Sequence, residues 1–117
     1  MSIIIIDDNV EICTLIEDVL TSEGFKCRSC TNPIIVFEMI KQQKPRLIVT
    51  DMLMSGIDGR EIVKQLKGDD STSDIKVLLI SAHPHAGPIS SDVGADAHLS
   101  KPFEISDLTD RVRALMS

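Results

Sequence analysis

The sequence has few aromatic residues, and this shortage excludes several kinds of ligand site. Three phenylalanines supply all of its Phe, Trp and Tyr content, so it offers no stacking platform for nucleic-acid bases or flavin rings. Positive charge is also scarce: 12 Lys and Arg against 18 Asp and Glu give a net charge of −6. Because that charge repels phosphate backbones and anionic membrane surfaces, we expect no direct nucleic-acid partner and no membrane partner.

Long hydrophobic runs and a cysteine framework are missing as well. The N-terminal apolar run, Ile3–Ile6, ends at Asp7 and Asp8 and is far shorter than a signal-peptide core or a membrane-spanning helix. Three cysteines without an export signal favour reduced thiols over disulfides. These features predict a cytoplasmic protein. A length of 117 residues predicts one domain, residues 1–117.

Short apolar runs alternate along the chain with longer amphipathic stretches, a pattern typical of βα units around a parallel sheet. The predicted strands are Ile3–Ile6, Phe25–Cys27, Arg46–Thr50, Ile75–Ile80 and Ala97–Leu99. The first, third and fourth are apolar without alternation, as expected of central strands with helices on both faces. The predicted fold class is therefore α/β.

Helices are predicted between the strands from apolar spacing and capping residues. Their approximate ranges are Asn9–Glu23, Asn32–Lys44, Gly59–Lys67 and Ser106–Met116. The connection after the fourth strand differs, because two prolines and a glycine lie close together in it. It predicts an irregular segment from His83 to Ser90 and a fourth helix of at most about two turns.

Polar side chains follow four of the five predicted strands. Asp7 and Asp8 follow the first, Asp51 the third, Ser81 the fourth and Lys101 the fifth. Ligands of an open parallel sheet bind at the carboxyl edge of its strands. We therefore expect these side chains to converge there, although they are far apart in the sequence.

Three neighbouring carboxylates repel one another unless a cation lies among them. Mg²⁺ suits such a site, because it prefers oxygen ligands and retains several waters. Metal, ammonium and hydroxyl groups around one carboxylate would stabilise a phosphoryl group in transfer to that carboxylate. The sequence therefore predicts Mg²⁺-dependent phosphoryl chemistry at this edge.

Four segments of the chain resemble the receiver domain of response regulators in two-component signal transduction. They are Ile3–Asp8, Ile48–Gly59, Val77–Ala82 and Gly94–Phe103, and the resemblance covers nearly the whole chain. It implies a flavodoxin-like, doubly wound five-stranded parallel sheet of order 2-1-3-4-5. The prolines and the glycine after the fourth predicted strand add a further expectation. The fourth helix of this fold should be shortened or irregular.

The resemblance also implies a phosphoacceptor rather than an ordinary enzyme. Asp51 would accept a phosphoryl group from a histidine kinase or phosphotransfer protein, with phosphorylation and dephosphorylation both self-catalysed. Asp8, Asp51 and the backbone carbonyl of Leu53 would bind Mg²⁺, and Asp7 would contact it through water. Such a stand-alone receiver, expected as a monomer or weak dimer, would signal through protein contacts.

Further residue roles follow from the same resemblance. Ser81 and Lys101 would bind phosphoryl oxygens, and the Lys101–Pro102 peptide bond would be cis. Ser81 and His98 would form the switch, with Ser81 moving toward the phosphate and the side chain at position 98 rotating inward. His98 is a departure, because the family usually has Tyr or Phe there.

The loop after Asp51 departs from the family as well. Ser55 stands where the family usually has Pro. Because Gly56 and Gly59 keep that loop flexible, we expect the chemistry to survive this change.

Three other patterns allow both a functional and a structural explanation. Cys27 and Cys30 have redox or zinc spacing, but residues i and i+3 of a strand point to opposite faces, which favours a structural role. His83 and His85 offer two metal ligands without an evident third, which favours an ordinary loop. The second predicted helix has more apolar residues than one buried stripe needs, which leaves core packing or a partner surface. Those residues are Ile34, Ile35, Val36, Phe37, Met39 and Ile40.

Three other functions compete with a phosphorylated receiver. A degenerate receiver would serve only as a protein-interaction module, against which the intact acidic set argues. A haloacid-dehalogenase-like phosphatase needs a second carboxylate two residues after its nucleophile, where this chain has Leu53. A flavodoxin-like FMN carrier needs a hydroxyl-rich phosphate loop and flanking Trp or Tyr, which the sequence lacks.

Overall fold

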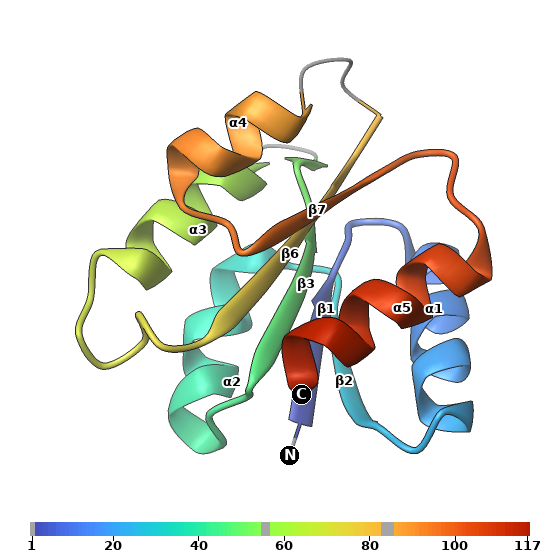
Figure 1. The fold of residues 1–117 in the computed structure, drawn as a ribbon. Helices are drawn as coiled ribbons and strands as arrows, with labels where there is room; N and C mark the ends of the chain where they lie inside the picture. The colour runs from blue at the N-terminus through green and yellow to red at the C-terminus, as the bar shows by residue number, and fades with distance from the viewer. Residues whose placement is uncertain (1, 55–56, 83–85) are drawn as a thin grey trace.

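The computed structural model describes residues 2–54, 57–82 and 86–117 as a sheet between two layers of helices (Figure 1). The sheet has five parallel strands in the order β2-β1-β3-β6-β7. They are β1 (Ser2–Ile6), β2 (Lys26–Cys30), β3 (Leu47–Asp51), β6 (Lys76–Ser81) and β7 (Ala97–Ser100). Without the short strands β4 and β5 this is the order 2-1-3-4-5, so the predicted flavodoxin-like α/β fold is confirmed.

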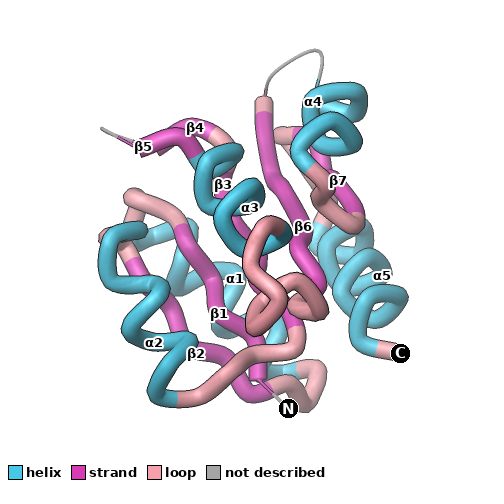
Figure 2. Tube along the Cα trace, turned by 90° about the vertical axis from the view of Figure 1, so that its left-hand side faces the viewer, coloured by secondary structure: helices cyan, strands magenta, loops and turns pink. Residues whose placement is uncertain are grey.

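Helices cover both faces of this sheet (Figure 2). They are α1 (Val10–Ser22), the 3-10 turn η1 (Pro33–Ile35), α2 (Val36–Gln42), α3 (Gly59–Lys67), α4 (Ala86–Val93) and α5 (Ile105–Met116). Buried side chains of α1 and α5 pack on one face of the sheet, and those of α2 and α3 pack on the other. None of these helices, within the residues described, is long and apolar enough to cross a membrane.

The central strands supply apolar side chains to both helix layers. In β1, Ile3 and Ile5 join the cluster with α1 and α5, whereas Ile4 and Ile6 join the cluster with α2 and α3. All four isoleucines are at most 1% exposed. Burial on both faces explains why the sequence of this strand shows no apolar–polar alternation.

Two side chains cap the helices that follow β1 and the β4–β5 hairpin. The Asn9 carboxamide oxygen accepts hydrogen bonds from the backbone N–H groups of Glu11 and Ile12, at 2.9 and 3.3 Å. Asp58 Oδ1 accepts one from the Arg60 backbone N–H at 2.9 Å. These caps fix where α1 and α3 begin relative to the strand ends.

The fourth helix differs in part from the prediction. α4 runs from Ala86 to Val93, so the predicted irregular conformation is wrong for residues 86–90. Pro88 is the third residue of the helix, where a backbone N–H has no intrahelical partner, so its missing donor costs nothing there. The expected shortness is confirmed by a length of 8 residues. His83 and His85 lie outside the described residues.

The connection from β3 to α3 contains a hairpin that the sequence did not predict. β4 (Leu53–Met54) pairs antiparallel with β5 (Ile57–Asp58), and Ser55 and Gly56 lie outside the described residues. β2 is also longer than expected, because it continues past Cys27 to Cys30 and pairs along its whole length with β1.

Candidate functional site

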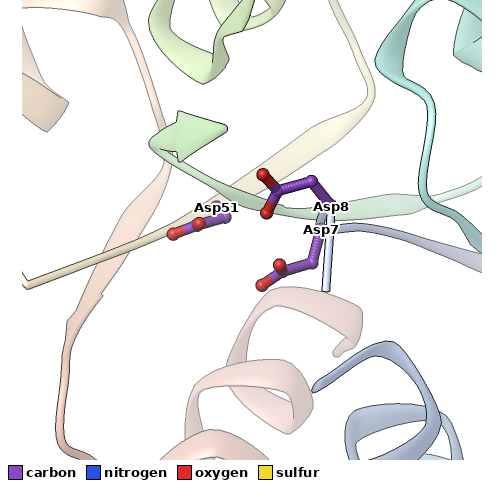
Figure 3. A group of neighbouring side chains, drawn as sticks. All are labelled: Asp7, Asp8 and Asp51. Atoms are coloured by element: carbon purple, nitrogen blue, oxygen red, sulfur yellow. The ribbon is translucent and has the colours of Figure 1, made fainter. Parts of the chain in front are cut away.

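Three aspartates lie together at the carboxyl edge of the sheet (Figure 3). Asp7 and Asp8 follow β1, and Asp51 is the last residue of the neighbouring strand β3. One carboxylate oxygen from each lies within 4.8 Å of the other two. The register explains this proximity, because Ile6 and Thr50, which precede Asp7 and Asp51, are direct partners in the sheet.

The three carboxylates differ in exposure. Asp7 is buried, the side chain of Asp51 is 12% exposed, and Asp8 is exposed. Asp7 Oδ1 accepts a hydrogen bond from the backbone N–H of Asn9 at 2.9 Å, which ties this carboxylate to the start of α1. The cluster is therefore open to solvent at Asp8.

The amine of Lys101 faces two of these carboxylates from the end of β7. Its Nζ lies 3.4 Å from Asp51 Oδ1 and 3.9 Å from Asp7 Oδ2. The Lys101 backbone N–H donates to the Ser81 carbonyl at 2.9 Å, which holds this segment against the end of β6. The Lys101–Pro102 peptide bond is cis, as the resemblance implied.

Burial and mutual repulsion disfavour the charged forms of the inner carboxylates. Burial raises the pKa of Asp7 above its ordinary value, and the charge of Asp51 raises it further against the opposing effects of the Asn9 N–H and Lys101. Burial also raises the pKa of Asp51, although Lys101 lowers it. The Lys101 ammonium therefore does not offset the effect of burial on the pKa of these two acids.

This donor set fits a hard divalent cation such as Mg²⁺. All three side chains offer oxygen atoms at mutual distances that one ion can bridge, and Mg²⁺ prefers oxygen ligands while keeping several waters. The exposed side of Asp8 leaves room for that water. A cation would also stabilise the ionised forms that burial disfavours.

The raised pKa of Asp7 predicts that Asp7→Asn stabilises the metal-free protein at neutral pH. A carboxyl group whose pKa is higher in the folded state favours folding below its unfolded pKa, and that contribution is lost as pH rises through the folded pKa. The gain in free energy of unfolding from Asp7→Asn should therefore grow as pH rises above about 4. Denaturant titrations in EDTA measure this gain, with the exposed Asp70→Asn as control. A gain independent of pH, or a loss of stability at pH 7, would contradict the prediction.

The two predicted switch residues occupy neighbouring strands. Ser81 ends β6 and is 2% exposed. His98 is half-buried in β7, and its carbonyl accepts a hydrogen bond from Arg111 Nε at 3.2 Å. Since Ala97 and Leu99 face the α1 and α5 layer, alternation along the strand directs His98 to the opposite face.

The thiols of the CxxC pattern are not part of the acidic cluster, which consists of Asp7, Asp8 and Asp51. Cys27 and Cys30 both lie in β2 and are free thiols, as is Cys13. Burial raises the pKa of the Cys27 thiol to about 11, which disfavours the thiolate that redox chemistry and zinc binding require. The Cys30 thiol donates to the Asn32 carbonyl at 2.7 Å. These contacts support the structural explanation.

The role of Asn9 in holding the Asp7 carboxylate was not predicted from the sequence. An Asp two residues before a helix cap is the pattern of an Asx turn, in which the side chain accepts a backbone N–H two residues on. Asp7 makes that bond with Asn9, while the Asn9 side chain caps α1. The spacing of these two residues was therefore a usable signal.

Comparison with known proteins places the chain in a family. Residues 3–113 match the response regulator receiver domain. The chain belongs to this family. It is 32% identical over 113 residues to sporulation initiation phosphotransferase F of Bacillus subtilis, covering 95% of this chain and 90% of that protein. It is also 32% identical to the phosphate regulon transcriptional regulatory protein PhoB of Pseudomonas aeruginosa, but that match spans 98% of this chain and only 51% of the regulator.

Solved structures of receivers share the fold. The receiver domain of a signal transduction histidine kinase from Syntrophus aciditrophicus matches with a TM-score of 0.89 at 26% identity, over 98% of this chain and 89% of that one. The response regulator TrrA from Thermotoga maritima, solved in complex with Mg²⁺ and BeF, matches with a TM-score of 0.86 at 25% identity, over 97% of both chains. Receivers are phosphoacceptor signalling domains that take phosphoryl groups from histidine kinases or phosphotransfer proteins, and they bind Mg²⁺ through acidic residues.

Proposed function

We propose that Asp51 of this receiver is the residue that accepts the phosphoryl group. A carboxylate oxygen of Asp51 attacks phosphorus in the donor's phosphohistidine, the P–N bond breaks, and its electron pair stays on the imidazole nitrogen. The product is an aspartyl phosphate. One observation carries the assignment: the Asp51 carboxylate lies 3.4 Å from Lys101 Nζ and within the cluster formed with Asp7 and Asp8.

Lys101 and Ser81 would stabilise the phosphoryl group during this step. The positively charged amine of Lys101 lies beside the Asp51 carboxylate. It would therefore be close to the equatorial phosphoryl oxygens, over which negative charge spreads in the transition state. Ser81, buried at the end of β6, would donate its hydroxyl hydrogen to one of those oxygens. Preorganised donors of this kind need little rearrangement when the charge develops.

The acidic residues would hold the metal. Asp8, Asp51 and the backbone carbonyl of Leu53 would ligate Mg²⁺ directly, and Asp7 would contact it through water. When bound, the ion supplies positive charge against the phosphoryl oxygens. Asp7 is held by the N–H of Asn9, so its charge stays directed at the cluster.

Hydrolysis would regenerate the Asp51 carboxylate. The residues of the receiver itself would catalyse both the phosphorylation of Asp51 and this dephosphorylation. Water attacks phosphorus, the bond from phosphorus to the Asp51 oxygen breaks, and inorganic phosphate leaves. The chain has Leu53 two residues after Asp51, where a haloacid-dehalogenase-like phosphatase would have its acid/base carboxylate. Rapid turnover as a phosphatase is therefore not expected of this chain.

Incubation with Mg²⁺ and a small acyl phosphate, followed by intact mass measurement, tests this function. If the protein is a phosphoacceptor, its mass should increase by one phosphoryl group. This increase should require Mg²⁺ and should not occur when EDTA is added before the donor. A protein that stays unlabelled under these conditions would instead be a degenerate receiver acting only through protein contacts. An FMN carrier would show no covalent gain but would retain flavin.

The donor protein would dock on an apolar surface beside the acidic cluster. A groove of about 420 Å³ lies between α1 and the segment after β7. Its lining consists of Ile12, Leu15, Ala82, Lys101, Pro102, Phe103 and Ile105. Leu15 and Ile105 are 46% and 55% exposed. Because Lys101 lines the groove and also contacts Asp51, a histidine kinase or phosphotransfer protein seated there would approach the acceptor directly.

Phosphorylation would be read out by Ser81 and His98. In this proposal Ser81 moves toward the phosphoryl group and the His98 side chain rotates inward. Because both ring nitrogens of a His side chain are polar, inward rotation of His98 would carry a desolvation cost that an apolar ring would not have.

We further propose that residues 1–117 act as one receiver domain in the cytoplasm, as a monomer or weak dimer, with no direct contact to nucleic acid or membrane. The net charge of −6 supports the last point.

A further inference from the structure

The first residue of α3 packs directly on the backbone of the proposed phosphoacceptor. A Cβ atom built on Gly59 would lie 2.2 Å from the carbonyl oxygen of Asp51 and 3.1 Å from the Cα of Met52. Both atoms belong to the backbone, so neither can turn away as a flexible side chain would. Only glycine fits at this position without a shift of the main chain.

This requirement comes from close approach and not from an unusual backbone conformation. The described glycines with positive φ are Gly24 and Gly94, and Gly59 lies in ordinary helical geometry at the start of α3. The expectation that Gly59 keeps the loop flexible is therefore replaced by a packing role. A side chain there would be excluded by contact with Asp51.

Both sides of the contact are held in place. The Met52 N–H donates to the Ile80 carbonyl of β6 at 2.8 Å, and the Gly59 N–H donates to the Met52 carbonyl at 2.7 Å. Asp58 holds the start of the helix as well, since its Oδ2 lies 2.8 Å from Arg60 Nε. The end of β3 and the first turn of α3 therefore cannot separate without breaking hydrogen bonds.

We propose that Gly59 is a positioning residue for phosphoryl transfer. Because Gly59 has no side chain, α3 can begin against the Asp51 carbonyl, and this packing sets the direction of the Asp51 carboxylate. The inference rests on the proposed role of Asp51 as acceptor. Two of the three atoms closest to a Cβ built on Gly59, the carbonyl oxygen and carbon of Asp51, belong to the residue that presents its carboxylate to Lys101 at 3.4 Å. A displacement of this peptide therefore moves the nucleophile.

The effect on rate follows from the sensitivity of such reactions to geometry. A misplacement of about 1 Å can lower a rate by about a hundredfold. Relief of a 2.2 Å contact to an ordinary separation requires a shift of the same order. We expect Gly59→Ala to slow phosphorylation by acyl phosphate by about tenfold or more at saturating Mg²⁺.

The test compares Gly59→Ala with Gly68→Ala. Gly68 caps the other end of α3, and its Cβ would lie 3.1 Å from the Lys64 carbonyl, far from the acceptor along the chain. NMR spectra of the metal-free proteins report the side-chain carboxyl ¹³C resonance of Asp51 and the amide resonance of Met52. The proposal expects both resonances to move, and the rate to fall, only in Gly59→Ala. A wild-type rate in Gly59→Ala, or equal losses in the two variants, would overturn it.

If Gly59→Ala does not fold, the Asp58→Ala variant is used for the test instead. This variant adds no atom near Asp51 but removes the cap and the Arg60 contact that hold the first turn of α3. The proposal expects the Asp51 resonance to move and the rate to fall, and an unchanged resonance and rate would refute it. If the wild type itself takes up no phosphoryl group, the proposed function fails, while the NMR comparison still decides whether Gly59 positions Asp51.

Discussion

Asp51→Asn should abolish the gain of a phosphoryl group from acyl phosphate and Mg²⁺. The amide lacks the anionic oxygen that attacks phosphorus, while its size keeps the end of β3 packed as before. Asp51 is 12% exposed and has Lys101 Nζ at 3.4 Å. Asp7 and Asp8 would remain in the variant with a weaker metal site, and neither ends the central strand β3. Intact mass after incubation with excess donor measures the result.

The control for this variant is Asp70→Asn, which changes an exposed aspartate in the connection between α3 and β6. It removes the same charge and should be labelled as the wild type is. Circular dichroism of both variants would show that the fold is retained. A full mass gain in Asp51→Asn would move the acceptor to another residue and remove the basis of the proposed mechanism.

Asp8→Ala should weaken Mg²⁺ binding by about tenfold or more while the fold persists. Asp8 is the exposed member of the cluster and the one most open to the waters that Mg²⁺ retains. Its removal relieves repulsion among three close carboxylates, so the metal-free variant should melt at the wild-type temperature or above it. Titration calorimetry with MgCl₂ gives the affinity, and thermal unfolding in EDTA gives the stability.

Lys101→Ala removes a positive charge from the site, whereas Asp8→Ala removes a negative charge. It removes the cation that lies 3.4 Å from Asp51 and 3.9 Å from Asp7, so Mg²⁺ should bind it at least as tightly as it binds the wild type. Phosphorylation should slow because a donor to the phosphoryl oxygens is lost. Unaltered Mg²⁺ affinity in Asp8→Ala would rule out the metal site in its proposed form.

Much of this fold could be predicted because its central strands are buried on both faces. Such burial demands continuous apolar runs such as Leu47–Val49 and Val77–Ile80, and these stand out in any window of the sequence. The convergence of Asp7, Asp51 and Lys101 followed from the same reasoning, since the ends of parallel strands meet at one edge. The central strands and the residues that follow them could therefore be predicted from local sequence patterns.

Features that depend on individual contacts between backbone groups could not be predicted from the sequence. The β4–β5 hairpin pairs two residues with two, which is too short for any periodicity to appear. The contact between Gly59 and the Asp51 carbonyl joins positions eight residues apart in sequence, and nothing in their types distinguishes close packing from flexibility. α4 was misjudged for another reason: Pro88 is compatible with a helix when it lies in the first turn.

The exposure of the three carboxylates also required the structure. Asp7 and Asp8 are adjacent and chemically identical, yet one is buried and the other exposed. The raised pKa of Asp7 comes first from that burial, which depends on how α1 and the segment carrying Lys101 close over the strand end. The sequence could identify these acids but could not show which of them is buried and which is exposed.

Among the residues that the structure describes, the sheet separates two apolar clusters that share no buried side chain, one with α1 and α5 and the other with α2 and α3. Substitutions in different clusters should therefore change the free energy of unfolding additively, because side chains that share no partners couple weakly. The proposed donor groove is built by α1 and the start of α5, whereas His98 faces the opposite layer. If the groove and His98 have the roles proposed for them, recognition of the donor and response to phosphorylation would be able to change separately over evolutionary time, each through substitutions on one side of the sheet.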